Sequence, residues 1–212
     1  MTTFPMRRFG GRCFPALAIA LAVATLGAAA TRAQDYKPMP GWAVDPKSGC
    51  KVWDDFLEPG ETVVWSGECS KGFAEGRGTV QWVLQGQDEE RYEGEMRGGK
   101  MTGAGTLSFP NGMHYEGQFK DNNFHGTGKL TYPNGDVYDG EFSDDDRSGK
   151  GTLTMRDGRR YVGEWKKDMP DGTGTLTRRD GKTYAGQWKM GCLRDGATKA
   201  ALIATPKECK IY

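Results

Sequence analysis

A 23-residue pattern is written four times in succession between residues 91 and 182, and it constrains the fold more than any other feature. Tyrosines stand at 92, 115, 138, 161 and 184, so each is 23 residues after the one before. A fifth copy begins at Tyr184 and then decays. A fixed period of this length is typical of a repeat array, in which every unit packs on its neighbours.

Each unit contains two short stretches with a period of two. One reads Tyr-x-Gly-x-aromatic, as in Tyr115–Phe119, and the other reads Gly-x-Gly-x-Leu, as in Gly103–Leu107. Alternation of this kind predicts strands rather than helices. The segment Phe109–Met113, which reads Phe-Pro-Asn-Gly-Met, joins the two. Its Pro, Asn and Gly suit a three-residue hairpin turn with a bulge.

The bulged turn sets a register that the side-chain pattern supports. If Phe109 pairs with Met113, Leu107 lies opposite Tyr115 on one face of the hairpin. A strict two-residue Asn-Gly turn would place these two residues on opposite faces, which the apolar pattern rejects. The same rule predicts the following further pairs: Gly105 with Gly117, Gly103 with Phe119, Lys129 with Asp139, and Lys150 with Glu164.

A disguised first unit precedes the regular ones. Trp65–Cys69 fits the tyrosine stretch and Gly76–Val80 fits the glycine stretch, each 27 residues before its counterpart. Four extra residues therefore lie between Trp82 and Arg91, where we expect them to lengthen one turn. One face of the array then carries Gly, Leu, Tyr and Phe or Trp, and the other carries Thr, Glu, Asp and Lys.

The units resemble MORN repeats, a family built on Tyr-x-Gly-x-Phe/Trp, Gly-x-Gly-x-Leu and a Pro-Asn/Asp-Gly turn. The resemblance covers about Val63 to Gly196. It implies an all-β fold, an elongated single-layer antiparallel sheet of successive β-hairpins. It also implies a role in scaffolding, in protein contacts or in binding membrane lipids.

Flanking segments differ in composition from the array. Residues 1–33 combine an arginine-rich start, the apolar run 16–30 and a small-residue cleavage site before Gln34, so they predict a secretory signal. The alternative is an uncleaved anchor, but the apolar run is short for a span. We expect residues 34–62 to form an irregular N-terminal cap with one short strand near 50–53, residues 63–196 the array of about six units, and residues 197–212 a C-terminal cap.

Charge excludes some partners. Loss of the four arginines in residues 1–33 takes the basic count from 29 to 25 against 28 acids, so the mature chain carries about −3. Nothing in this balance favours nucleic acid. With its secretory signal, the chain is expected to be an exported protein of bacterial type, periplasmic or extracellular.

Cysteines of the exported chain predict two disulfides. Cys50, Cys69, Cys192 and Cys209 remain after removal of residues 1–33. Cys69 lies in the first unit and Cys192 in the last, roughly 50 Å apart at about 4.8 Å per strand. Bridged Cα atoms lie within about 7 Å, so that pair is excluded. Joining Cys50 to Cys69 and Cys192 to Cys209 closes one short loop at each end of the sheet.

No residues stand in a pattern that predicts catalysis, a cofactor or a metal. The Gly-x-Gly runs lack the Gly-Lys-Ser/Thr of a phosphate loop. His114 and His125 have no further ligands at metal-site spacing, and Asp144–Asp146 lacks the alternating ligands of a calcium loop, so we expect a solvated loop there.

We therefore expect a non-enzymatic scaffold or docking protein that binds a protein or envelope component, and the alternative is a phospholipid-binding module at a membrane surface. The partner and the oligomeric state stay open. The candidate binding surface is the aromatic face or the sheet edges, with these rings: Tyr92, Tyr115, Phe119, Tyr138, Phe142, Tyr161, Trp165, Tyr184 and Trp188.

Overall fold

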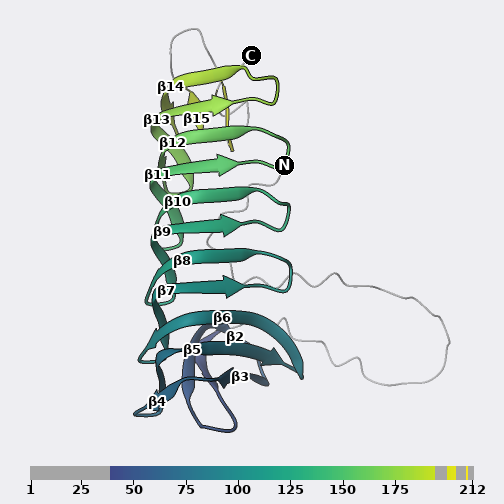
Figure 1. Ribbon diagram of the computed structural model, residues 1–212, viewed down its shortest axis with the longest axis vertical. Coiled ribbons are helices and arrows are strands. Elements are labelled where there is room, and N and C mark those ends of the chain that lie inside the picture. The colour runs from purple at the N-terminus through teal and green to yellow at the C-terminus, as the bar shows by residue number, and fades with distance from the viewer. Residues whose placement is uncertain (1–38, 194–199, 204–208, 210–212) are drawn as a thin grey trace, which may run out of the picture.

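The computed structural model describes residues 39–193, 200–203 and 209. The predicted signal at 1–33 and the expected junction at Gln34 lie outside these residues. The described chain forms one open sheet of successive antiparallel hairpins, stacked into the long array of Figure 1. None of the described residues forms a helix that could cross a membrane.

The sheet contains fifteen strands, which follow the chain order from β5 to β15. Their bounds are β1 (Met39–Val44), β2 (Lys51–Leu57), β3 (Glu61–Trp65), β4 (Glu68–Ser70), β5 (Phe73–Leu84), β6 (Gln87–Arg97), β7 (Lys100–Ser108), β8 (His114–Lys120), β9 (Asn123–Thr131), β10 (Val137–Ser143), β11 (Asp146–Thr154), β12 (Arg160–Lys166), β13 (Met169–Thr177), β14 (Thr183–Lys189) and β15 (Cys192–Leu193).

The predicted register is confirmed. In the β7–β8 hairpin, Leu107 pairs with Tyr115, Gly105 with Gly117 and Gly103 with Phe119. The amide of Phe109 donates to the carbonyl oxygen of Met113 at 3.0 Å, which closes the three-residue turn. The polar-face pairs Lys129–Asp139 and Lys150–Glu164 also form.

The opposite ends of the strands are joined by two-residue turns that the sequence analysis did not identify. Asp121 and Asn122 link β8 to β9 with φ of 50° and 74°. Positive φ at both positions is the signature of a type I′ turn, whose twist matches that of the flanking strands. The same geometry recurs at 71–72, 98–99, 144–145, 167–168 and 190–191. We call this set of six turns the turn column.

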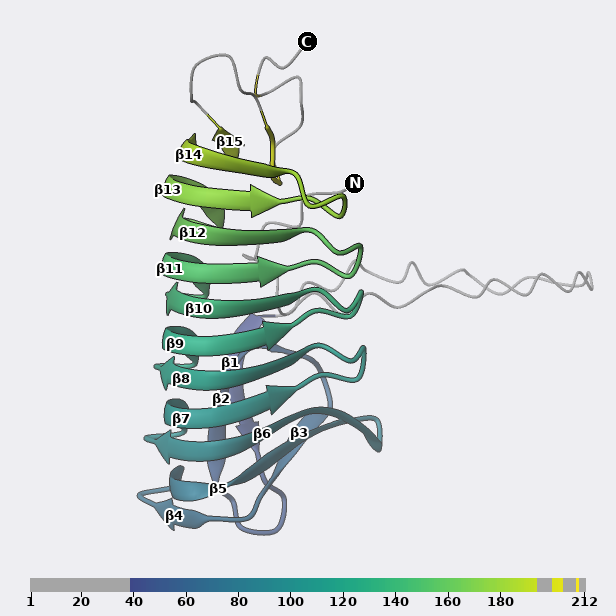
Figure 2. The ribbon, with the colours of Figure 1, turned by 45° about the horizontal axis from the view of Figure 1, so that its top comes forward.

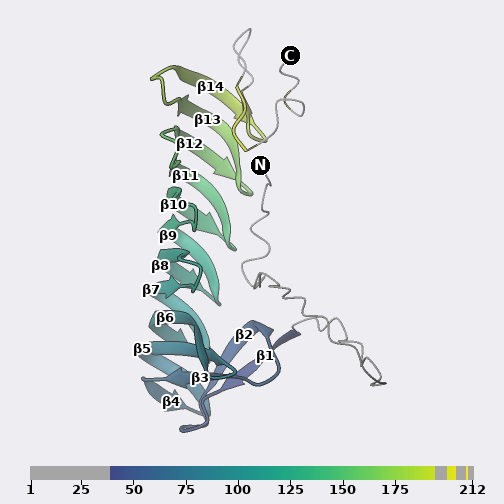
Figure 3. The ribbon, with the colours of Figure 1, turned by 90° about the vertical axis from the view of Figure 1, so that its right-hand side faces the viewer.

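The core lies on one face of the single layer, where each unit tyrosine covers a pair of glycines. A Cβ added at Gly117 or Gly128 would clash with the ring of Tyr115, and Tyr138 covers Gly140 and Gly151 in the same way. Past the glycine the strand carries a bulge, at Gly117/Gln118 for example. Figure 3 shows the strands bending toward the side on which the β1–β2 hairpin lies.

The disguised first unit has the same arrangement. A Cβ on Gly67 or Gly78 would clash with the ring of Trp65, so Trp65 holds the place of the unit tyrosines. Its indole nitrogen donates to the carbonyl oxygen of Glu68 at 2.7 Å, as the Tyr92 hydroxyl donates to that of Glu95 at 2.9 Å.

The four extra residues lengthen strands instead of a turn, which corrects our expectation. Pairing of β5 with β6 continues to Leu84 and Gln87, and a tight turn at Gln85 and Gly86 closes the hairpin. A register shift between Gln81 and Val83 absorbs the irregularity. The reason is that Gly86 tolerates the positive φ that a two-residue turn requires.

The N-terminal segment is more regular than expected. Instead of one short strand near 50–53, β1 and β2 form a hairpin in which Trp42 faces Trp53. Pro40 is tolerated because β1 is the edge strand of the sheet. Figure 2 shows this hairpin running across the repeat strands, along the axis of the array. The carboxylate of Asp45 accepts the amide of Trp65 at 3.3 Å and so ties the hairpin to the first unit.

Both predicted disulfides are present. Cys50 bonds to Cys69 with Cα atoms 5.8 Å apart, and Cys192 bonds to Cys209 with Cα atoms 5.4 Å apart. Each bond lies at one end of the sheet, and it ties Cys69 of β4 or Cys192 of β15 to a cysteine outside the strands. The two ends of the stack are therefore held by covalent as well as hydrogen bonds.

Because the tyrosine ring lies on the glycine pair, we expect substitutions at the two positions to have strongly coupled effects on stability. We expect Gly151→Ala to lower the free energy of unfolding by about 2–3 kcal/mol, because the added methyl group enters the ring of Tyr138. In a Tyr138→Leu background, which removes the ring, the same change should cost less than about 1 kcal/mol. Urea unfolding of the four proteins measures the coupling. Equal costs in the two backgrounds would contradict the packing described here.

Candidate binding surface

The nine rings of the predicted surface do not form an exposed row, which corrects that part of our expectation. All nine are between 0 and 7% exposed. The physical reason is mutual packing: the ring of Tyr115 meets those of Phe119 and Phe142 edge to face, with centroids 5.1 and 5.2 Å apart. Tyr138 meets Trp165 in the next unit at 5.2 Å. Their part in binding stays a prediction.

Burial also removes acid–base chemistry from these tyrosines at neutral pH. Loss of water around the hydroxyl raises the pKa of Tyr92 to about 12, and burial raises the pKa of Tyr115, Tyr138 and Tyr161 further. Each of the four hydroxyls instead donates to the backbone carbonyl three residues later, where the strand bulges.

The turn column forms a second ordered feature, held together from unit to unit. The amide of Asn122 donates to the carbonyl oxygen of Met101 at 3.1 Å, and the Asn122 side-chain oxygen accepts the amide of Met101 at 2.7 Å. Asp145 makes the same two contacts with Phe124. The second residue of one turn thus satisfies both backbone groups of a residue that follows the preceding turn.

The last unit shows what decides the residue at this position. There the second turn residue is Gly191, which has no side-chain acceptor, and it faces Pro170, which has no amide to satisfy. Gly191 still donates its own amide to the carbonyl oxygen of Pro170 at 2.9 Å. At this turn the missing side-chain acceptor thus faces a residue that has no amide to satisfy.

Asp145 is the most perturbed carboxylate of the turn column. Burial raises its pKa from 3.8 to about 6, against the lowering effect of the hydrogen bond from Phe124. The negative charges of Asp55, Asp146 and Asp144 raise it further. Our expectation of a solvated loop at 144–146 is therefore wrong for Asp145, because its carboxylate turns inward to accept the amide of Phe124.

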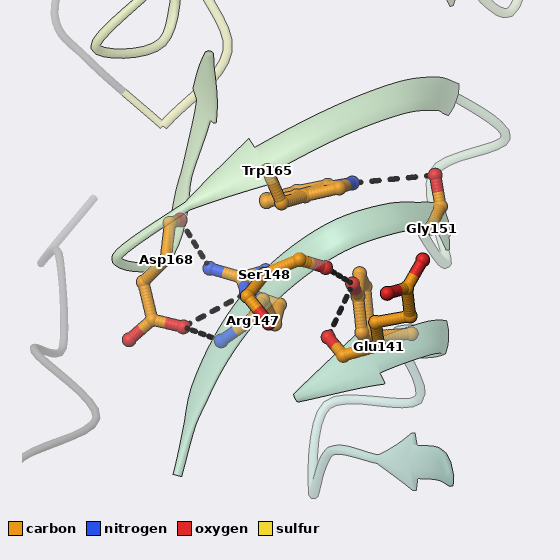
Figure 4. A network of polar contacts seen from close by, with 7 residues as sticks. Glu141, Arg147, Ser148, Gly151, Trp165 and Asp168 are labelled. Atoms are coloured by element: carbon orange, nitrogen blue, oxygen red, sulfur yellow. Dashed lines mark hydrogen bonds and ion pairs between the residues drawn. The ribbon is translucent and has the colours of Figure 1, made fainter. Parts of the chain in front are cut away.

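Arg147 holds the position of Phe124 in the next unit and carries a positive charge. It is buried, and its guanidinium lies 4.4 Å from the centre of the Trp165 ring and 5.6 Å from that of Tyr138 (Figure 4). Its Nε donates to the Asp168 carboxylate at 3.2 Å and its Nη2 to the Asp168 carbonyl oxygen at 2.8 Å. One unit earlier, Phe124 takes this place and stacks on Tyr115 at 3.7 Å.

The polar face carries a shallow groove of about 870 Å³ above the glycine pairs, between β5 and β10. Backbone of Gly105, Gly117 and Gly128 forms its floor, since the tyrosine rings lie on the far side. Exposed side chains flank it with mixed charge, for example Glu116, and Lys129 opposite Asp139.

Neither histidine belongs to a group of metal-binding side chains among the described residues. His114 Nδ1 lies 3.0 Å from the hydroxyl of Ser108, in the register position opposite it. His125 pairs with Gln118 in the next hairpin. Within the described residues no group of three or more His, Cys, Asp or Glu side chains could hold a metal ion.

Comparison with known proteins agrees with the repeat pattern. The family model described as MORN repeat matches four segments, residues 92–114, 115–137, 138–159 and 161–183. No protein of curated function matches the sequence. Among solved structures, the SAS-4 (dCPAP) TCP domain of Drosophila melanogaster, in complex with a proline-rich motif of Ana2 (dSTIL), matches with 15% identity and a TM-score of 0.33. That match covers 80% of this chain and 99% of that domain's chain.

The raised pKa of Asp145 predicts a pH-dependent stability. The folded state favours the protonated acid, so this group contributes stability below about pH 4 that is lost as pH rises through about 6. Asp145→Asn keeps the acceptor, as Asn122 does one unit earlier, and removes the charge. We expect it to raise the free energy of unfolding by about 1–3 kcal/mol at pH 7 and to leave it nearly unchanged at pH 4.

Thermal melts of both proteins from pH 4 to 8 check this expectation. Asp180→Asn is the control, because Asp180 is an exposed turn acid at the other edge of the array. An equal gain from Asp145→Asn at pH 4 and pH 7 would contradict the assignment.

Arg147 and Asp168 should behave as a unit. Arg147→Phe copies the residue at 124 but leaves the Asp168 carboxylate without its cation, so we expect a loss of about 2–4 kcal/mol at pH 7. Adding Asp168→Asn should restore most of that loss, since Asn122 serves the same turn position without a charge. Urea unfolding at pH 7 measures both steps. Additive losses in the double variant would show that the pair is not coupled.

Proposed function

We propose that this chain, whose residues 92–183 are four MORN repeats, is a non-enzymatic scaffold or docking protein that is exported and binds another protein or an envelope component. MORN repeats suggest a scaffold or a membrane-associated binding module. The carrying observation is that the apolar face is consumed by packing within the array, while the side chains of the polar face are exposed.

Export is supported by the two disulfides as well as by the sequence of residues 1–33. Disulfides form and persist in oxidising compartments, and Cys50–Cys69 and Cys192–Cys209 hold the two ends of the sheet. A stapled end resists fraying of the terminal strands. Such a rod can present the same surface over its full length, which suits a scaffold.

A second candidate, binding to a phospholipid surface, is favoured by one patch on the β1–β2 hairpin. Met39, Trp42 and Val44 are exposed there. Lys51 lies over the Phe73 ring at 5.8 Å from its centre, beside the ring of Trp42. Exposed Trp with neighbouring Lys is typical of protein surfaces that sit at a membrane interface.

A charge exchange on the polar face tests docking. The double change Lys129→Glu and Asp139→Lys keeps the pair between these two positions and the net charge. It reverses the pattern that a partner meets, and it sets two acids opposite each other at positions 116 and 129. We expect the melting temperature to stay within about 2 °C of the parent, while retention of envelope proteins by the immobilised array falls at least about tenfold.

Trp42→Ser is the matched change for the lipid candidate. Loss of co-sedimentation with anionic phosphatidylglycerol vesicles in Trp42→Ser, with protein retention unaffected by the charge exchange, would replace docking by lipid binding. Retention that survives the charge exchange would contradict docking through the polar face.

A further inference from the structure

The edge of the array that carries the three-residue turns becomes strongly basic in its last two hairpins. The turn segments 109–114 and 132–137 contain no Lys or Arg. The corresponding segments 155–160 and 178–183 contain six cations and two acids, a net charge of +4 in a chain whose expected mature charge is about −3. We call the six side chains the basic patch: Arg156, Arg159, Arg160, Arg178, Arg179 and Lys182.

Closure of these turns does not depend on the basic side chains. The amide of Phe109 donates to the carbonyl oxygen of Met113 at 3.0 Å, and the amide of Met155 donates to that of Arg159 at 2.8 Å. The turn at 178–182 closes in the same way at 2.8 Å. Because the turn at 109–113 reaches the same geometry without a cation, the fold itself does not explain the basic patch.

The two basic turns are neighbours in the stack. Strands β11 to β14 follow one another in the sheet, so the β11–β12 and β13–β14 turns lie side by side on the right of Figure 1. Equivalent residues of the two turns are two strands apart, which is roughly 10 Å. Arg156 and Arg179 hold equivalent positions, and so do Arg159 and Lys182. The cations therefore form short rows that follow the axis of the array.

The aliphatic stems of the arginines are held by packing. The stem of Arg179 lies on Gly158, and that of Arg156 lies in the same way on the preceding turn. The Arg178 guanidinium lies 4.9 Å from the centre of the Tyr184 ring. Side chains that are already ordered lose less conformational entropy when a ligand binds them.

The charged ends of these side chains are largely unpaired among the described residues. Arg159 is half-buried and forms an ion pair with Asp157 at 2.8 Å, whereas the other five cations are exposed and have no ion pair within residues 39–193, 200–203 and 209. Desolvation opposes the charge of Asp157, but hydrogen bonds from Arg159 and the positive charges of Arg159 and Arg179 lower its pKa. Since Arg179 belongs to the next turn, the charges of the two turns act on each other and form one patch.

The side chains of the patch favour a hydrophilic polyanion. Five of the six cations are arginines, whose planar guanidinium groups bind two oxygens of a carboxylate at once. Within 155–160 and 178–183 no exposed side chain is apolar or aromatic, because Met155 is buried. Protein interfaces and membrane-surface contacts use exposed apolar or aromatic side chains as anchors. A polymer of acidic sugars needs charge and hydrogen-bond donors instead.

We propose that the basic patch binds a linear acidic polysaccharide, which lies along the edge of the array across the β11–β12 and β13–β14 turns. Carboxylate groups of its sugar units pair with Arg156 and Arg179, the equivalent cations of the two turns. Arg160, Arg178 and Lys182 flank this row and add to the attraction.

This site goes beyond the proposed docking through the polar face and does not depend on it. The docking test changes Lys129 in β9 and Asp139 in β10, and the basic patch lies on the turns that follow β11 and β13. The two sites can therefore be changed independently in the full chain.

Labelled alginate oligomers test the site, because they carry a carboxylate on every sugar unit. Neutral dextran oligomers of the same length and polyglutamate of the same charge are compared with them by fluorescence anisotropy at physiological salt. We expect alginate to bind and dextran not to bind. Polyglutamate should bind at least about tenfold more weakly than alginate, because its more flexible chain loses more conformational entropy on binding.

Two double variants locate the contact. Arg156→Gln with Arg179→Gln should weaken alginate binding at least about tenfold. The control, Lys120→Gln with Lys166→Gln, removes the same charge near the turn column at the opposite edge and should leave binding unchanged. All four residues are exposed, and melting temperatures verify that each variant is folded.

Four outcomes overturn the inference. Absence of alginate binding shows that the patch is no polysaccharide site, and equal weakening by the two double variants shows attraction by net charge alone. Polyglutamate that binds as tightly as alginate replaces the polysaccharide by an acidic peptide. Phosphatidylglycerol vesicles that bind through Arg156 and Arg179 more tightly than alginate replace it by a lipid surface.

The same measurements separate this site from the proposed docking function. If alginate does not bind while the charge exchange at Lys129 and Asp139 lowers partner retention, docking stands and the polysaccharide site is wrong. If alginate binds through Arg156 and Arg179 while retention survives the charge exchange, docking through the polar face is wrong and the polysaccharide site stands.

Discussion

A tyrosine ring lying on two glycines is the contact on which the rest of this structure depends. A single-layer sheet has no second layer to cover its apolar face, so its core must come from its own side chains. Removing the side chain at both glycines of a cross-strand pair makes room for one ring flat against the backbone. The next aromatic residue of the strand then closes over that ring edge to face, and the following unit repeats the arrangement.

The ring also explains where the strands bend. Each tyrosine hydroxyl reaches the carbonyl group three residues on, at the point where pairing shifts by a bulge. A bulge increases local twist and turns the strand toward the covered face. The curl of the strands in Figure 3 therefore has the same cause as the burial of the rings. A flat sheet of these residues would leave the tyrosine rings without cover and the bulges without the hydrogen bonds from the tyrosine hydroxyls.

Sequence reasoning recovers the part of the fold that depends on side-chain alternation. The period, the register of Leu107 with Tyr115 and the disulfide pairing all follow from local pattern and from distance along the stack. It fails where one residue serves a contact far along the chain. Asn122, Asp145 and Asp168 recur every 23 residues, and this spacing was a visible signal, but their partners lie 21 residues earlier, in the strand that follows the preceding turn. The burial of the aromatic rings was missed for a related reason, since alternation tells which face a ring is on and not what else packs there.

Both ends of the array are covered in the same way, by backbone amides that donate to the carbonyl groups of the turn column. An open sheet of hairpins has unsatisfied groups at its last strands and along the side where its turns stack. At the N-terminal end β2 donates to Gly72 and Gly99, and at the C-terminal end Leu202 donates to Gly191. Glycine occurs at these three turns, where another segment of the chain crosses closely, whereas Asn or Asp occurs at the turns that no described strand crosses. Among the described residues, glycine therefore marks the turns that another segment of the chain covers, and Asn or Asp marks the turns whose side chains satisfy the backbone of the preceding unit.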